Sequence, residues 1–270
     1  MRLLITMFIF FYAISFQQQS SLVLLKQGIA KYHEGDFHGA IQNYNEAIEQ
    51  DPRFWRFYMY RAKAKLELED FVGAVQDYDK AFELQPNFYE SLTKRGASRY
   101  KIEDFNIAVV DYKKANEFYP KRWIIHLMRG AAYAGMSDHE RALVDFTRAI
   151  ELQPENYNIY IFRGMAHLNL QHLQEARIDF STAIKLYPEN YVPYLKAGLC
   201  DLAIGDTLAA IDHFSIALTR NPHCGEAFFN RGKVYSVLPG KMEDACADFQ
   251  RADALGYTKA YRMVQKYCTQ

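Results

Sequence analysis

The sequence predicts an all-α protein: a right-handed α-solenoid of seven 34-residue repeats, closed by a C-terminal capping helix. The first observation is a fixed internal period. The stretch 123–156 carries Gly130, Ala142, Phe146, Ala149 and Pro154, and residues of the same kinds recur 34 positions before and after it. The second observation is that no linker, low-complexity run or second domain interrupts this period. A period of this size is the signature of a repeat architecture.

The recurring positions describe two closely packed helices per repeat. Each repeat is numbered from 1, so that residue 123 is position 1 of the fourth repeat. Small residues at positions 8, 20 and 27 let two backbones approach, and an aromatic residue at position 24 fills the space beside them. Asp or Gly near positions 15 and 16 ends the first helix and caps the second. Proline at position 32 closes the unit, and neighbouring repeats must stack to bury their apolar faces.

This set of positions resembles the tetratricopeptide repeat family over most of the chain. The repeats occupy 21–54, 55–88, 89–122, 123–156, 157–190, 191–224 and 225–257, and residues 258–270 form the capping helix. The seventh repeat gains one residue in its internal turn and ends at Gly256 instead of a proline. The resemblance implies stacked helical hairpins whose concave face binds a partner protein.

The first 16 residues differ from the rest and match a secretory signal peptide. Arg2 precedes an uncharged, mainly apolar run, and polar residues follow at 17–20. The run is shorter than the stretch of about 20 residues that a membrane-spanning helix needs. The order basic, apolar, polar is that of a signal peptide. We therefore expect 1–16 to be cleaved and the protein to be exported to the periplasm or cell surface of a bacterium. An uncleaved anchor and a buried capping helix are the alternatives.

Charge and motifs argue against two classes of function. The 32 basic and 32 acidic side chains balance, whereas a nucleic-acid-binding protein needs a basic face. The sequence motifs of serine hydrolases, zinc peptidases and phosphate-binding loops do not occur, and the histidines form no metal-ligand pattern. We therefore expect a protein that is not an enzyme and has no cofactor and no metal.

Two polar positions recur together and predict an ion pair inside the repeat. Position 7 is Arg and position 23 is Asp in five repeats, while repeats 1 and 6 lack both residues. Joint presence and absence indicates contact. The predicted structural pairs are Arg61–Asp77, Arg95–Asp111, Arg129–Asp145, Arg163–Asp179 and Arg231–Asp248. The alternative is a row of arginines that grips an anionic ligand, but a paired arginine is not free to do so.

The first helices also carry the candidate partner site. Positions 2, 5, 9, 12 and 13 resemble the ligand-contacting set of the family. Chaperone-binding members clamp a terminal carboxylate there with Lys and Asn, but here no repeat has Lys at position 5 or Asn at position 9. The predicted groove is mainly apolar and consists of Leu127, Ala131, Ile161, Met165, Leu168, Leu195, Leu199, Leu202 and Phe229. The alternative is that these side chains only pack against each other.

The four cysteines predict one disulfide. Cys246 and Cys268 lie symmetrically about the turn at 256–257, so an antiparallel helix pair places them at matching height. Cys200 occupies a small buried position and is expected to be a free core thiol. A Cys246–Cys268 disulfide is compatible with an oxidising compartment.

These features together predict an exported, non-catalytic scaffold that binds another protein or a peptide in its concave groove. No nucleic-acid partner is expected, and no membrane span after the signal is removed. The C-terminal segment 244–268 resembles exported repeat proteins of Bacteroidetes-type bacteria. Two alternatives stay open: a structural subunit of a cell-envelope assembly that uses its convex face, and a cytoplasmic, co-chaperone-like adaptor.

Overall fold

The computed structural model describes residues 19–86 and 88–268, so the predicted signal peptide 1–16 lies outside the described residues. Within these ranges every regular element is a helix and no strand occurs. The chain divides into two compact units, residues 1–136 and 137–270, and each is described by itself.

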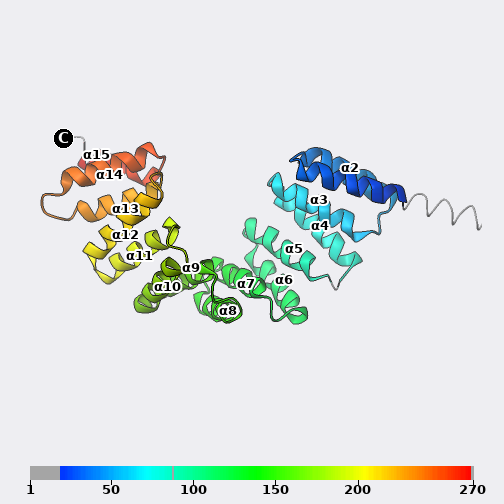
Figure 1. The fold of residues 1–270 in the computed structure, drawn as a ribbon, viewed down its shortest axis with the longest axis horizontal. Coiled ribbons are helices and arrows are strands. Elements are labelled where there is room, and N and C mark those ends of the chain that lie inside the picture. Colours follow the sequence, from blue (N-terminus) through cyan, green and yellow to red (C-terminus); the bar gives the residue numbers. More distant parts are fainter. Residues whose placement is uncertain (1–18, 87, 269–270) are drawn as a thin grey trace, which may run out of the picture. The chain divides into compact units, whose positions relative to one another are not determined.

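Unit 1 contains three helical hairpins and the first helix of a fourth repeat (Figure 1). The helix of residues 19–33 pairs with α2 (Phe37–Gln50). The next hairpins are α3 (Trp55–Glu67) with α4 (Phe71–Leu84) and α5 (Tyr89–Lys101) with α6 (Phe105–Phe118), followed by α7 (Trp123–Gly135). From α2 to α7, each helix packs against the next one in the chain.

Unit 2 continues the same pattern from α8 (His139–Leu152) onward. Its hairpins are α9 (Tyr157–Asn169) with α10 (Leu173–Leu186), α11 (Tyr191–Ile204) with α12 (Thr207–Arg220), and α13 (Gly225–Tyr235) with α14 (Met242–Ala254). The capping helix α15 (Thr258–Tyr267) packs against α14. The bounds of α2 to α14 fall inside the predicted repeats, whereas the first helix begins at residue 19, before the first repeat. The predicted all-α solenoid of stacked hairpins is confirmed.

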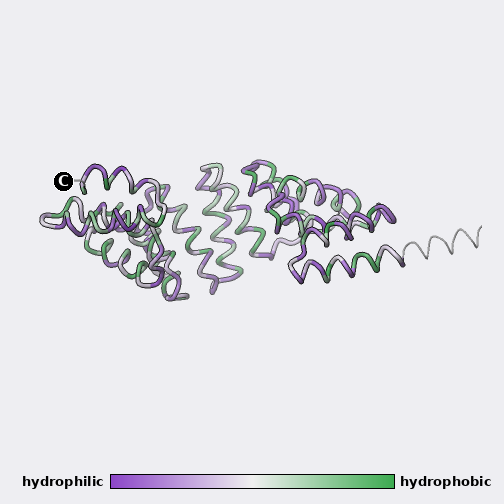
Figure 2. The backbone as a smooth tube through the Cα atoms, turned by 90° about the horizontal axis from the view of Figure 1, so that it is seen from above, coloured by the Kyte–Doolittle hydropathy of each residue, from purple (hydrophilic) through white to green (hydrophobic). Residues whose placement is uncertain are grey.

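Each hairpin is built around one aromatic ring from position 24 of its second helix. The rings are fully buried in all seven repeats: Tyr44, Tyr78, Tyr112, Phe146, Phe180, Phe214 and Phe249. A side chain at position 8 limits how closely the first helix can approach, since a Cβ added to Gly164 would lie 2.8 Å from the Phe180 ring. Along the helices, apolar residues that face the core alternate with polar residues, as the hydropathy colours show (Figure 2).

The turn inside the hairpin depends on a left-handed residue at position 15. Gly35 and Gly205 supply it in repeats 1 and 6, and Gly240 supplies it in the longer turn of repeat 7, but Glu69, Glu103, Ser137 and Gln171 adopt φ values of 59° to 62° in repeats 2 to 5. An aspartate at position 16 then caps the second helix in repeats 1, 2, 4 and 6. Asp36 Oδ1, for example, accepts a hydrogen bond from the backbone N–H of Gly39 at 2.9 Å. The expected break and cap are confirmed, although the left-handed position is not restricted to glycine.

Gln171→Gly should stabilise the protein by about 0.5–1 kcal/mol. A residue with a side chain in the left-handed conformation costs about 1–2 kcal/mol of strain, which glycine avoids. Glycine loses more chain entropy on folding, and this offsets part of the gain in stability. Gln171 is exposed, so little packing is lost. Gln171→Ala keeps the strain and is the control. Thermal unfolding should show a raised Tm for the glycine variant only; equal values for both variants would argue against strain at this position.

The C-terminal cap is tied to the last repeat by the predicted disulfide. Cys246 on α14 and Cys268 after α15 are bonded, with their Cα atoms 5.4 Å apart. The other two cysteines, Cys200 and Cys224, are free and buried. Ala260 is the only residue of α15 that is fully buried, and it belongs to the apolar cluster that contains Phe229 of α13 and Phe249 of α14.

Reducing the Cys246–Cys268 disulfide should destabilise the cap by about 3 kcal/mol in the chain-entropy model for a loop of this length. Peptide mapping without reductant should first recover the two cysteine-containing peptides linked. After reduction, hydrogen exchange should accelerate in α15 and remain unchanged in α9 and α10. Free thiols at Cys246 and Cys268 themselves, in protein purified from an oxidising compartment, would contradict the bond.

Candidate functional site

The predicted arginine–aspartate pairs form bidentate bridges within the repeats. Arg61 donates from Nε and Nη2 to the two carboxylate oxygens of Asp77, at 2.9 and 2.6 Å. The same geometry occurs in Arg95–Asp111, Arg163–Asp179 and Arg231–Asp248. These four aspartate side chains are at most 7% exposed, so each carboxylate needs its partner to offset desolvation. Arg129 and Asp145 belong to different units, and their pairing stays a prediction.

These arginines also reach the preceding repeat. The third nitrogen, Nη1, donates to position 25 of the previous second helix. Arg61 reaches Asn45 at 2.6 Å, and Arg231 reaches Ser215 at 3.0 Å. One guanidinium thus joins three helices: its own first helix, the second helix of its repeat and the second helix of the repeat before. The four described arginines are therefore structural, as expected, and are not free to grip an anionic ligand.

Repeat 1 replaces the ion pair with neutral amides. Asn43 Nδ2 donates to Gln27 Oε1 at 3.3 Å, and Lys31 Nζ donates to Asn43 Oδ1 at 2.8 Å. The two helices are therefore still joined by polar contacts at the same positions.

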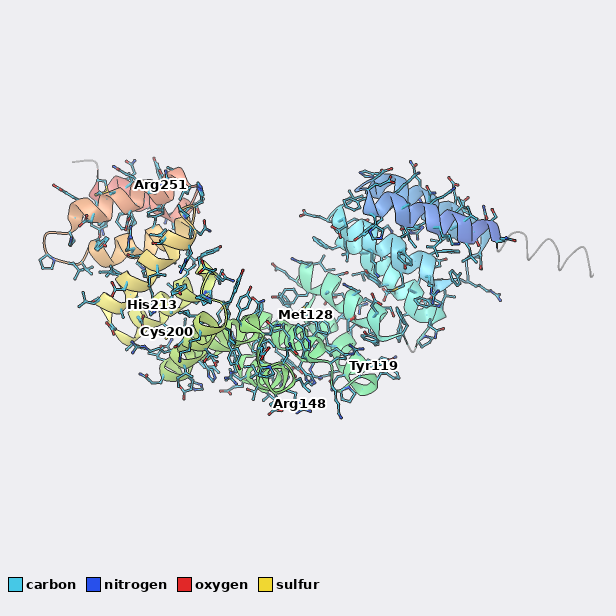
Figure 3. The ribbon with its side chains drawn as sticks, in the orientation of Figure 1. Tyr119, Met128, Arg148, Cys200, His213 and Arg251 are labelled. Carbon is cyan, nitrogen blue, oxygen red and sulfur yellow. A yellow bond between two sulfur atoms is a disulfide. The ribbon has the colours of Figure 1, made fainter. Side chains whose placement is uncertain are left out.

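Repeat 6 moves the buried acid to the other helix. Asp201 on α11 is fully buried, and its Oδ2 lies 2.6 Å from Nδ1 of His213 on α12 (labelled in Figure 3). Its Oδ1 lies 3.4 Å from Nε of Arg177, which comes from α10 of the preceding repeat. Repeat 6 thus keeps a buried carboxylate and a contact to its neighbour, but the carboxylate comes from the first helix instead of the second.

Arg163→Gln should destabilise the protein by about 3–5 kcal/mol, because it strands the buried carboxylate of Asp179. Adding Asp179→Asn creates the neutral pair that repeat 1 already uses, Gln27 with Asn43, and should recover part of the loss. Denaturant unfolding of the two single variants and the double variant gives the interaction energy. Purely additive losses would show that the two side chains do not interact.

The predicted apolar groove is mostly packing surface. Five of its nine residues are buried: Leu127, Ala131, Ile161, Leu195 and Phe229. Leu168, Leu199 and Leu202 are half-buried, whereas Met165 is exposed at 36%. Leu195, only 3% exposed, packs in one cluster with Phe214 and Leu218 of the following helix. The expected exposed strip through repeats 4 to 6 is therefore wrong, because neighbouring helices cover these positions.

Two hollows open instead among the first helices of unit 1. Hollow 1 has a volume of about 450 Å³ and is lined by Ile29, Tyr32, His33, Tyr60, Lys63, Leu66, Glu67, Tyr78 and Lys94. Hollow 2 has a volume of about 400 Å³ and is lined by Tyr89, Glu90, Thr93, Lys94, Ala97, Tyr112, Ile124 and Met128. Met128, on α7, is labelled in Figure 3. Most lining residues come from first helices, at positions 2, 5, 6, 9 and 12.

Most charged groups around hollow 1 already have partners. Lys63 Nζ lies 3.2 Å from Glu90 Oε1. The hydroxyl group of Tyr32 donates to Glu67 at 2.8 Å. Burial is the main cause, and this hydrogen bond the second, of the rise in the pKa of Tyr32 to about 12. Lys94 differs from them: it is exposed, lines both hollows, and its ammonium group has no ion-pair or hydrogen-bond partner among the described residues.

Two of the three tyrosines at position 24 line the hollows. Tyr78 lines hollow 1 and Tyr112 lines hollow 2, whereas Tyr44 of repeat 1 lines neither. All three hydroxyl groups are buried without a hydrogen-bond partner in the part of the chain that the structure describes. Burial raises the pKa of all three, so they remain protonated donors. A buried donor without a partner is uncommon and points to an absent acceptor.

Positions 1, 6 and 24 are the lining positions outside the predicted contact set; Tyr89 of hollow 2 is the residue at position 1. Position 24 has the character of a core position, and its ring is indeed buried. The available signal was the change along the chain: this position is Tyr in repeats 1 to 3 and Phe in repeats 4 to 7. Lys94 at position 6 carried no such signal.

Two other kinds of site are absent from residues 19–86 and 88–268. No group of three or more His, Cys, Asp or Glu side chains there could hold a metal ion. None of the helices in these ranges is both long enough and apolar enough to cross a membrane.

Comparison with known families decides the relationship that the repeat pattern suggested. A family model described as tetratricopeptide repeat matches residues 25–87, 127–191 and 195–257, well over half of the chain. The chain belongs to the tetratricopeptide repeat family. Tetratricopeptide repeat proteins are generally non-catalytic scaffolds that bind other proteins or peptides. No curated protein sequence matches the chain.

Solved structures of tetratricopeptide repeat proteins share the fold. One from Parabacteroides merdae ATCC 43184 is 17% identical, with a TM-score of 0.76, covering 92% of this chain and 97% of its own. YrrB, described as having an unusual peptide-binding site, is 21% identical over 68% of this chain and 95% of its own, with a TM-score of 0.56. MamA from Desulfovibrio magneticus RS-1 is 19% identical over 62% and 94%, with a TM-score of 0.60. At these identities the likeness extends to the fold.

Proposed function

We propose that this tetratricopeptide repeat protein is a non-catalytic scaffold that binds an extended segment of another protein along the first helices of unit 1. The observation that carries the proposal is the pair of adjacent hollows that share Lys94, each lined by a tyrosine whose buried hydroxyl group has no hydrogen-bond partner among the described residues. Their volumes lie within the range of about 300–1,000 Å³ typical of ligand sites. The peptide-binding site named for YrrB lends support by analogy.

The spacing of the hollows suits an extended chain. Packed helices lie about 8–10 Å apart, and an extended chain advances about 3.3–3.6 Å per residue. Side chains about three residues apart on one segment can therefore enter the two hollows. Hollow 2 is lined by Ala97, Ile124 and Met128, and so favours an apolar side chain. Hollow 1 is more polar, since it contains both lysines and Glu67.

Ala97→Glu should abolish most of this binding, because it places a charge in the apolar hollow 2. The measurement is retention of a random pool of N-acetylated, C-amidated dodecapeptides on immobilised protein, read by mass spectrometry. Retention should fall several-fold, with little change in the helical circular dichroism signal or in Tm. The matched control is Met165→Glu, at the same repeat position but lining neither hollow.

A third variant separates this proposal from its alternative. Val110 on α6, 59% exposed, lies on a second helix, as the alternative of an envelope subunit binding through its convex face would require. If Val110→Glu weakens retention and Ala97→Glu does not, the partner surface belongs to the second helices. If the unmodified protein retains no peptide, binding of extended segments is contradicted.

We also propose that the protein is exported from a bacterial cell. The order of charge and apolarity in residues 1–16 supports this, and the Cys246–Cys268 disulfide suits an oxidising compartment. N-terminal sequencing of the natively expressed protein should begin at Phe16 or Gln17. A chain that retains Met1 would favour the alternative of a cytoplasmic adaptor.

A further inference from the structure

We infer that hollow 1 is a carboxylate site that takes an Asp or Glu side chain of the bound segment, held between Lys94 and the hydroxyl group of Tyr78. This inference rests on the proposed function and specifies the chemistry of its partner. The residues that carry it belong to α4 and α5, within unit 1.

The two unused groups at hollow 1 are both donors. The hydroxyl group of Tyr78 is buried without an acceptor among the described residues. The ammonium group of Lys94 lines the same hollow, likewise without a partner there. A neutral carbonyl group would satisfy the hydroxyl but leave the charge of Lys94 unbalanced. A carboxylate has two acceptor oxygens and the complementary charge, so it can satisfy both groups.

The acids that also lie near hollow 1 are already engaged. Glu90 is paired with Lys63 at 3.2 Å, and Glu67 accepts from the hydroxyl group of Tyr32 at 2.8 Å. These contacts reduce the repulsion that an incoming carboxylate meets. Glu67 has a hydrogen-bond donor but no neighbouring cation, so its negative charge still repels an incoming carboxylate on its side of the hollow. We therefore place the acid on the side of the hollow formed by Lys94 and Tyr78.

The hydroxyl group of Tyr78 is not needed to pack the repeat. In repeats 4 to 7 the same buried position is a phenylalanine: Phe146, Phe180, Phe214 and Phe249. A tyrosine whose hydroxyl is buried without a partner is less stable than phenylalanine in such a position, unless a ligand accepts its hydrogen bond. Tyr78 and Tyr112 line the hollows, and the position is phenylalanine in repeats 4 to 7, none of which contributes its ring to either hollow.

The test compares three pools of capped dodecapeptides that are random except for one central position, fixed as Glu, Gln or Lys. Blocked termini exclude a terminal carboxylate. The unmodified protein should retain the Glu pool about tenfold better than the Gln pool, as expected for a hydrogen bond to a charged group. The preference should weaken with added salt, because Lys94 is exposed. The Lys pool should be retained least.

Two variants should remove this preference without unfolding the protein. Tyr78→Phe deletes one hydroxyl group, and Lys94→Gln deletes one exposed charge; each should bring the ratio of Glu to Gln retention close to one. Tyr44→Phe is the matched control, because it removes the same group from the same repeat position but lines neither hollow. It should leave the ratio unchanged. Melting temperatures of all three variants check the fold.

The outcomes separate this inference from the function on which it rests. Retention of peptides with no preference for Glu overturns the carboxylate site and leaves the scaffold proposal in place. A preference that survives Tyr78→Phe and Lys94→Gln places the acid elsewhere and overturns the inference. Recovery of binding only when the peptides have free C-termini assigns the site to a chain terminus instead of a side chain. Absence of any retention contradicts both proposals.

Discussion

The architecture depends on one contact, the arginine that joins three helices. A stack of hairpins has no long-range connection except between neighbours, so each interface must specify its own geometry. Arg95 does so with a planar, five-donor group: two nitrogens fix Asp111 in its own repeat, and a third reaches Asp79 of the preceding repeat at 2.7 Å. A buried carboxylate with bidentate geometry tolerates little sliding of one helix against another. Apolar contacts between alanines alone would allow many registers.

The same close packing explains where open surface remains. Small residues at positions 8, 20 and 27 bring the two helices of a hairpin together, and the ring at position 24 fills the space that they leave. The tip of that ring lies beneath the first helices. A tyrosine there therefore carries its hydroxyl group to the floor of the face between first helices. Tyr78 and Tyr112 thus have two roles: the ring packs in the core, and the hydroxyl group is a candidate binding group.

Much of this could be predicted from the sequence because the internal copies act as an alignment. Co-occurrence of Arg at position 7 with Asp at position 23 predicted four bridges that the structure contains, and symmetry about the last turn predicted the disulfide. The groove could not be predicted in this way. Leu195 and Met165 are both apolar residues of first helices, but only packing against the next helix decides that Leu195 is covered and Met165 is not. The hollows likewise depend on side-chain lengths in three helices at once, and no single position records that.

The buried acid on the first helix of repeat 6 limits how far this protein can be treated as a set of interchangeable modules. Asp201 depends on Arg177 of the repeat before it, and the arginine of repeat 7 reaches back to Ser215 of repeat 6. Transplanting repeat 6 alone into another array would leave a buried acid without its cation. The smallest portable piece at this end of the chain is therefore larger than the sequence period. Recombination between such genes would preserve folding best at boundaries that keep repeats 5 to 7 together.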